Sequence, residues 1–163
     1  MTRIGQAVML LHAGDREEAR KRFGIIWSEI GESGDALHRC TLAHYMAGTQ
    51  DDPGDGLAWD LRALTAAEAL TGTASADQDV EREGAGHEDI EHRDMTAVRA
   101  LVPSLHLHLA GSYLKLQCFE AARIHLDRAW DAVAVLGDDG YGGGVRAAIG
   151  RMEQRMRGSG AGE

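Results

Sequence analysis

The chain contains few of the residues that mark membrane, disulfide-rich or nucleic-acid-binding proteins. It has two cysteines, two prolines, three tryptophans, three tyrosines and two phenylalanines in 163 residues. No run of about 18 apolar residues is present, so no segment is expected to span a bilayer as a helix. The net charge is −9, which would repel a phosphate backbone. We therefore expect neither a membrane nor a nucleic acid as partner.

The two cysteines, Cys40 and Cys118, both fall in apolar helical patterns. Reduced thiols of this kind are typical of a cytoplasm. The apolar patch near the amino terminus meets charged residues at Asp15, too soon for a secretory signal. We therefore expect a cytoplasmic protein. Fifteen arginines against two lysines, with abundant alanine and glycine, favour a bacterial source with a GC-rich genome.

Alanine, leucine, glutamate and arginine are abundant and favour helices. The segment Ser104–Leu116, SLHLHLAGSYLKL, tests this preference. Five of its residues alternate as in a strand, which would offer two histidines to one metal ion. A helical stripe is longer, with spacings of 3, 4, 4 and 3 along Val102, Leu105, Leu109, Tyr113 and Leu116. On a helix, His106 and His108 point about 200° apart. The sequence therefore predicts a helix, on which these two histidines cannot bind one ion together.

A second stripe follows after only two residues, Gln117 and Cys118. It has spacings of 3, 4, 3 and 4 along Phe119, Ala122, Leu126, Ala129 and Val133. The short connection predicts an antiparallel helix hairpin. A shift of 103 residues aligns this hairpin with the amino-terminal one at six identities: Ala7 with Ala110, Leu11 with Leu114, Glu17 with Glu120, Ala19 with Ala122, Arg20 with Arg123 and Trp27 with Trp130. The chain therefore contains an internal repeat.

A weaker middle copy lies between these two hairpins. It places Leu42-Ala43 opposite Leu109-Ala110, and its turn runs through Asp51–Gly54. Proline and glycine in that turn suit the start of a new helix, for which the expected apolar stripe is Leu57, Leu61 and Leu64. Trp59 lies off this stripe and is expected to contact a neighbouring helix. The other two tryptophans, Trp27 and Trp130, are expected to pack in the core or between repeats.

The hairpins resemble tetratricopeptide repeats, whose pattern reads Leu-Gly-x2-Tyr and then Ala-x3-Phe. The third hairpin reads Leu109-Ala110-x2-Tyr113 and then Ala122-x3-Leu126, and the first has Ala19-x3-Phe23 after Gly14 at the turn. The resemblance implies an all-α, right-handed superhelix of three antiparallel hairpins, at about 3–31, 35–70 and 96–135. A further stripe of Val145, Ile149, Met152 and Met156 predicts a capping helix at about 141–157.

One stretch does not fit the repeat. The second and third units are 67 residues apart, against 36 for the first and second, which leaves an insert at about 71–86. The segment Thr71–Met95 holds eight acids and two arginines, a composition that cannot bury enough surface to order itself. We therefore expect one domain over 1–157 with a flexible acidic insert, followed by a disordered tail at 158–163. From His87 onward the next helix is expected to extend backward, with a kink at Pro103.

Motifs for catalysis and cofactor binding are missing. The chain has no Gly-x-Ser-x-Gly, Cys-x-x-Cys or His-Glu-x-x-His motif, and the segment GYGGG lacks the lysine of a phosphate loop. His87 and His92 are five residues apart, unlike a helical zinc pair, although the acidic segment around them could take up zinc or nickel loosely. We expect no catalytic residue, no metal site and no cofactor, and hence no enzyme.

In helical repeats the first helix of each hairpin lines a concave binding surface. The resemblance places nine residues there: Leu11, His12, Cys40, His44, Leu107, His108, Gly111, Leu114 and Lys115. The function we expect is binding of a protein or peptide segment in this groove. The alternative is a small-molecule-binding or accessory protein that uses the same groove. An exposed face on the last helix could also pair two copies of the chain as a homodimer.

Overall fold

The computed structural model describes the backbone of residues 2–76 and 85–159, and the side chains of residues 2–70 and 96–158. Over these ranges the regular structure is entirely helical, without a strand, so the all-α prediction is confirmed. The helical prediction for Ser104–Leu116 is confirmed as well. None of the helices described has the length together with the apolar content that a bilayer crossing requires.

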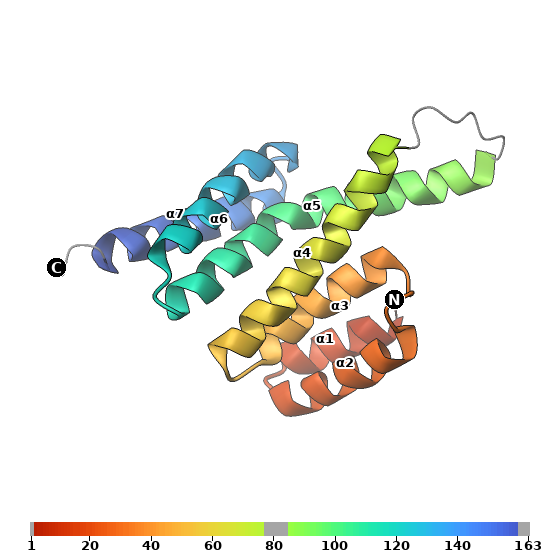
Figure 1. Ribbon diagram of the computed structural model, residues 1–163, viewed down its shortest axis with the longest axis horizontal. Coiled ribbons are helices and arrows are strands. Elements are labelled where there is room, and N and C mark those ends of the chain that lie inside the picture. The colour runs from red at the N-terminus through yellow and green to blue at the C-terminus, as the bar shows by residue number, and fades with distance from the viewer. Residues whose placement is uncertain (1, 77–84, 160–163) are drawn as a thin grey trace. The chain divides into compact units, whose positions relative to one another are not determined.

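Figure 1 shows the helices in chain order. Their bounds are α1 (Thr2–His12), α2 (Arg16–Ile30), α3 (Ala36–Thr49), α4 (Pro53–Ala76), α5 (Ala85–Lys115), α6 (Phe119–Ala132), the short 3₁₀ helix η2 (Val133–Val135) and α7 (Gly140–Ser159). The chain divides into two compact units, which we call unit 1 (Met1–Val98) and unit 2 (Arg99–Glu163). The sequence had indicated one domain over 1–157. Each unit is described by itself.

In unit 1 three aspartates mark the helix starts. The carboxylate of Asp15 accepts a hydrogen bond from the Glu18 N–H at 3.3 Å, and that of Asp35 accepts one from the His38 N–H at 2.8 Å. Side-chain oxygens at this position satisfy N–H groups that have no partner in the first helical turn. At the start of α4, Asp52 accepts from two backbone N–H groups. The helix begins at Pro53, as the turn sequence predicted.

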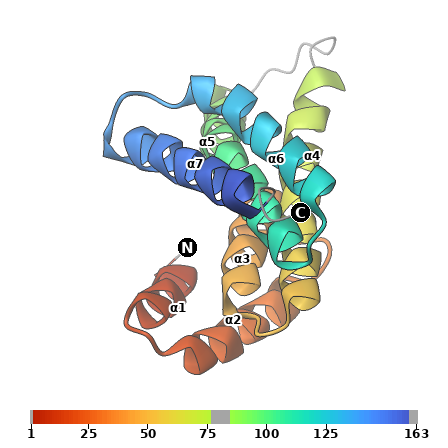
Figure 2. The ribbon, with the colours of Figure 1, turned by 90° about the vertical axis from the view of Figure 1, so that its left-hand side faces the viewer.

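The first four helices of unit 1, which also holds the start of α5, pack as two consecutive hairpins. α1 contacts α2 and α3, α2 contacts α3, and α3 contacts α4; Figure 2 shows α2 beside both α1 and α3. Small residues at the helix contacts are fully buried, among them Ala7, Ala19 and Ala43. Bulky side chains fill the space around these close approaches, and the core they form is Ile4, Ala7, Ala19, Phe23, Ile26, Leu42 and Met46.

The tryptophans of unit 1 join α2 to α4. Trp27 and Trp59 meet edge to face with ring centroids 4.9 Å apart, a favourable arrangement for aromatic rings. Arg39 lies over the Trp27 ring at 5.9 Å and Arg62 over the Trp59 ring at 4.8 Å, so each ring also has a cation–π contact. The prediction that Trp59 contacts a neighbouring helix is confirmed.

The apolar stripe predicted for α4 was wrong at Leu61, which is 40% exposed. The buried face of this helix is instead Asp60, Ala63, Leu64, Ala66 and Ala67. A stripe of large apolar residues does not mark this face, because close helix packing selects small ones. Asp60, at 2% exposure, lies among them.

In unit 2 the hairpin of α5 and α6 packs against one further helix, α7. α5 continues through Pro103 as a single helix, and the stripe on α6 is buried except at its first residue, Phe119, which is 47% exposed. Val145 and Ile149 of α7 pack with Leu126 and Ala129 of α6, and the shared core is Ala110, Leu126, Ala129, Val133, Leu136, Val145 and Ile149. The predicted stripe on α7 is therefore confirmed at the residues that contact α6.

Two regions of interest fall partly outside the described residues. α4 ends at Ala76 and α5 begins at Ala85, so helices enter the predicted insert from both sides, and residues 77–84 lie outside the description. The side chains of His87 and His92 lie outside it too. At the carboxyl end α7 extends to Ser159, two residues into the segment predicted as a tail.

Candidate functional site

On the first helix of unit 1, the predicted groove residues Leu11 and His12 are adjacent but differ in exposure. Leu11 is half-buried and packs against the core of the unit, whereas His12 is exposed in the last turn of α1. The helix that carries them, α1, contacts α3. His12 is the polar residue of this pair that a bound partner could reach.

The groove residues of α3 are Cys40 and His44, one turn apart. Cys40 is fully buried, and burial raises the pKa of its thiol to about 11. A thiol in this state is a packing group and is not reactive at neutral pH. His44 is half-buried, with its ring edge against Tyr45 at a centroid distance of 5.4 Å. Of the two residues, His44 alone is accessible to a partner.

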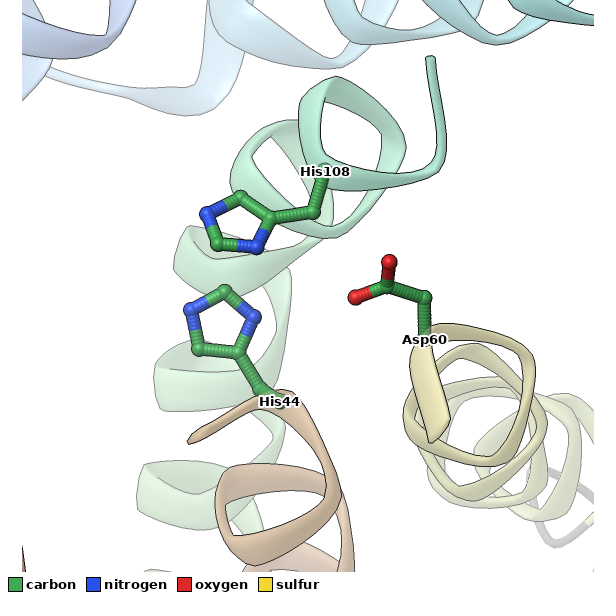
Figure 3. A group of neighbouring side chains, drawn as sticks. All are labelled: His44, Asp60 and His108. Carbon is green, nitrogen blue, oxygen red and sulfur yellow. The ribbon is translucent and has the colours of Figure 1, made fainter. Parts of the chain in front are cut away.

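His44 lies opposite a carboxylate. Figure 3 shows its ring on α3 turned toward the side chain of Asp60 on α4, and a ring nitrogen and a carboxylate oxygen lie within 4.8 Å of each other. Asp60 is only 2% exposed. A buried carboxylate is costly unless polar groups surround it, so His44 contributes to an environment in which Asp60 is tolerated.

Imidazole nitrogen and carboxylate oxygen are both donors that zinc accepts, but a zinc site takes four ligands, at least three of them from the protein. Within the described part of unit 1, no third histidine, cysteine or acid joins His44 and Asp60 at this spacing. The pair by itself is a polar feature of the α3–α4 hairpin.

The five groove residues predicted in unit 2 have different surroundings. The position of a side-chain carbon on Gly111 would be 3.3 Å from the terminal methyl of Met152 on α7, so α7 lies directly against this glycine. Leu107 packs with the same core as Met152, and Leu114 is half-buried. His108, which is also drawn in Figure 3, and Lys115 are exposed on α5. The capping helix thus covers part of the surface that the resemblance assigned to a partner.

A histidine pair that the groove prediction did not include lies inside unit 2. His106 of α5 and His125 of α6 are 9% and 8% exposed, and their Nδ1 atoms are 3.1 Å apart. The ring of Tyr113 stacks on His125 with centroids 5.4 Å apart and an angle of 13° between the planes. The two histidines therefore form a buried hydrogen bond between the helices of the hairpin.

Both imidazoles are held toward the neutral form. Burial, with smaller contributions from the neighbouring His125 and Arg128, lowers the pKa of His106 to about 4. Burial and Arg128 also lower the pKa of His125. Water would stabilise an imidazolium ion better than this site does.

The sequence contained a signal for this pair that the periodicity analysis did not use. His106 lies four residues before Ala110, and His125 lies three residues after Ala122, so each is one helical turn from a buried alanine of the hairpin. In an antiparallel hairpin, two residues at the same distance from the connection lie opposite each other. His106 and His125, each one turn farther from the connection than the buried alanine, therefore meet. The prediction that His106 and His108 lie on different sides of the helix is confirmed, since the first is buried and the second exposed.

Comparison with known proteins adds no relative to these observations: no family model, curated protein or solved structure matches the chain.

Proposed function

We propose that this chain is a tetratricopeptide-like interaction module that binds a segment of another protein on the surface shared by α1 and α3. The observation that carries the proposal is the contact between these two helices, which carry an exposed His12 and a half-buried His44. In stacked helical repeats the first helices of successive hairpins lie side by side and form the inner surface.

The packing of unit 1 supports this assignment. α1 contacts its own partner helix α2, and both helices of this first hairpin contact α3, the first helix of the next hairpin. This is the order of contacts expected when hairpins stack. Fully buried alanines at Ala7 and Ala43 occupy the same place in consecutive first helices. Together with this function we propose a right-handed superhelix, in which the stacking of hairpins continues.

The surface of unit 1 is preferred over that of unit 2 because of α7. Gly111 and Leu107 of unit 2 pack with Met152, so a segment bound there would have to displace the capping helix. On unit 1 the predicted groove residues Leu11, His12 and His44 keep exposed or half-buried side chains, with Leu11 supplying apolar contact. Segments that dock between helices use such apolar contacts with a few polar groups for orientation.

The proposal is tested by selecting displayed peptides on the full chain and measuring the affinity of those selected. His12→Glu should weaken binding at least tenfold, about 1.4 kcal/mol, because it places a charge on the proposed surface. Ile25→Glu is the matched control, since Ile25 is 47% exposed on α2 and the substitution adds the same charge elsewhere. The control should bind as the unaltered chain does.

Equal losses of peptide affinity in the two variants, or selected peptides that bind neither α1 nor α3, would contradict the proposal.

A thermal-shift screen with metabolites examines the small-molecule alternative. A stabilising compound whose effect is lost in His44→Ala but kept in Ile25→Glu would favour that alternative.

A further inference from the structure

The contact between His106 and His125 depends on the number of protons it holds. At 3.1 Å, one Nδ1 must carry a hydrogen and donate it, while the other must be bare and accept it. Among the residues that the structure describes, no third histidine, cysteine or acid lies close enough to these two nitrogens to complete a metal site. The contact is therefore a hydrogen bond between two imidazoles.

Full protonation removes this hydrogen bond. An imidazolium ion donates from both of its nitrogens, so when both histidines are charged no acceptor remains between them. Two N–H groups and two positive charges would then face each other in a site that is less than a tenth exposed. The closed hairpin can hold one added proton at this contact but not two.

The charged neighbour of the pair is itself a cation. Arg128 of α6 repels a proton on either ring, and Tyr113 of α5 covers one face of His125. Among the described residues no carboxylate of α5, α6 or α7 forms an ion pair with His106 or His125. Protonation of the pair therefore weakens the packing of α5 against α6.

We propose that the His106–His125 hydrogen bond is a proton-sensitive latch that keeps α5 and α6 together and releases them when the pair is protonated. This device is independent of the proposed binding surface on unit 1. It would make unit 2 open in mildly acidic solution while unit 1 stays closed.

The pH window follows from the direction of the pKa shifts. Histidines in an opened hairpin have pKa values near 6.5, whereas in the closed hairpin the pKa of His106 is lowered to about 4 and that of His125 is lowered also. Below pH 6.5 the open state thus binds more protons than the closed state. The latch contributes fully above pH 6.5 and loses its effect as the pH falls toward 4.

Hydrogen exchange of the full chain tests the latch, with α2 as the internal reference for α6. As the pH falls from 6.5 to 5, the equilibrium constant for opening of α6 should rise about tenfold relative to that of α2. Each proton taken up on opening raises this constant by up to about tenfold per pH unit. The matched variant is His106→Asn with His125→Asn, because an amide near each Nδ1 position can donate or accept without titrating. In this variant the change should stay below about twofold.

The same pH response in the double variant and the unaltered chain would overturn the proposal, and so would parallel opening of α2 and α6. If the double variant does not fold, the ring signals of the two histidines in the unaltered chain decide by nuclear magnetic resonance. The latch requires both to titrate below pH 6 together with loss of protection in α6. Titration near pH 6.5 with protection unchanged would also overturn it.

Discussion

The turn between α1 and α2 and the turn between α5 and α6, 103 residues later, are closed by the same hydrogen bonds. The N–H of Gly14 donates to the carbonyl of Leu11 at 3.1 Å, and the N–H of Gln117 donates to the carbonyl of Leu114 at the same distance. In each turn the following N–H reaches back five residues, at 3.0 and 2.9 Å. Both turns are Schellman motifs, although the residues in them differ.

The differing residues suit the motif unequally. Gly14 has φ of 90° and Gln117 has φ of 59°, a left-handed conformation that glycine adopts freely and glutamine does not. At the next position Asp15 caps α2 through its side chain, whereas Cys118 gives α6 no side-chain cap. The second turn keeps its geometry without favourable residues. Packing of the two helices, and not the turn sequence, therefore imposes the geometry in unit 2.

The two hairpins also differ on one outer face. Arg3 and Arg22 of unit 1 correspond by the same shift to His106 and His125 of unit 2. The arginines are exposed and pair with acids, Arg22 with Glu18 at 2.8 Å, while the histidines are buried against each other. Equivalent positions of the two hairpins are therefore solvated ion pairs in unit 1 and a buried hydrogen bond in unit 2.

The largest effects should come from the bulky core residue of each hairpin, Phe23 in unit 1 and its counterpart Leu126 in unit 2. Both are buried, and truncation to alanine leaves a cavity. Phe23→Ala should cost about 3–5 kcal/mol and Leu126→Ala about 2–5 kcal/mol, measured by urea denaturation. A cost below about 1 kcal/mol in either variant would show that the two positions are not equivalent.

Overpacking the small residues should have the next largest effect. Ala19 and Ala122 are both fully buried, and leucine at either position forces extra carbons between close helices. Ala19→Leu and Ala122→Leu should each lower the free energy of unfolding by about 1–3 kcal/mol. Thermal unfolding of the two variants checks this, and a silent Ala122→Leu would mean that α5 and α6 do not cross there.

The helix caps sharpen the comparison at a smaller scale. Asp15→Ala should destabilise the chain by about 0.5–2 kcal/mol because the Glu18 N–H loses its acceptor. Cys118→Asp should stabilise it by up to a similar amount, since it supplies the cap that α6 lacks. Urea denaturation of both variants measures the changes. Loss of stability in Cys118→Asp would indicate that the two helix starts differ in geometry.

The smallest effect is expected at Lys115, a groove residue that is exposed on α5. Lys115→Ala should leave the free energy of unfolding within about 0.5 kcal/mol of its original value, as substitutions of exposed residues usually do. Thermal unfolding measures this. A larger loss would place the Lys115 side chain in the packing of unit 2 and remove it from the candidate groove.

The sequence predicted the parts of this fold that depend on periodicity. The alanine positions, the capping stripe at Val145 and Ile149, and the helix at Ser104–Leu116 all follow from spacing. The burial of Asp60, the exposure of Leu61 and the contact of His106 with His125 depend on how neighbouring helices approach, which spacing along one helix does not contain. Gln117 is instructive, because its left-handed backbone conformation could be predicted only from its alignment with Gly14.

That alignment supplies the most direct test of the claim that both hairpins adopt one turn geometry imposed by helix packing. Gln117→Gly should stabilise the chain by about 1 kcal/mol and Gly14→Gln should destabilise it by a similar amount, both measured by urea denaturation at neutral pH. The opposite signs at equivalent positions are the result the account predicts. A loss of stability in Gln117→Gly would contradict it, because glycine lowers stability wherever a residue has an ordinary right-handed conformation.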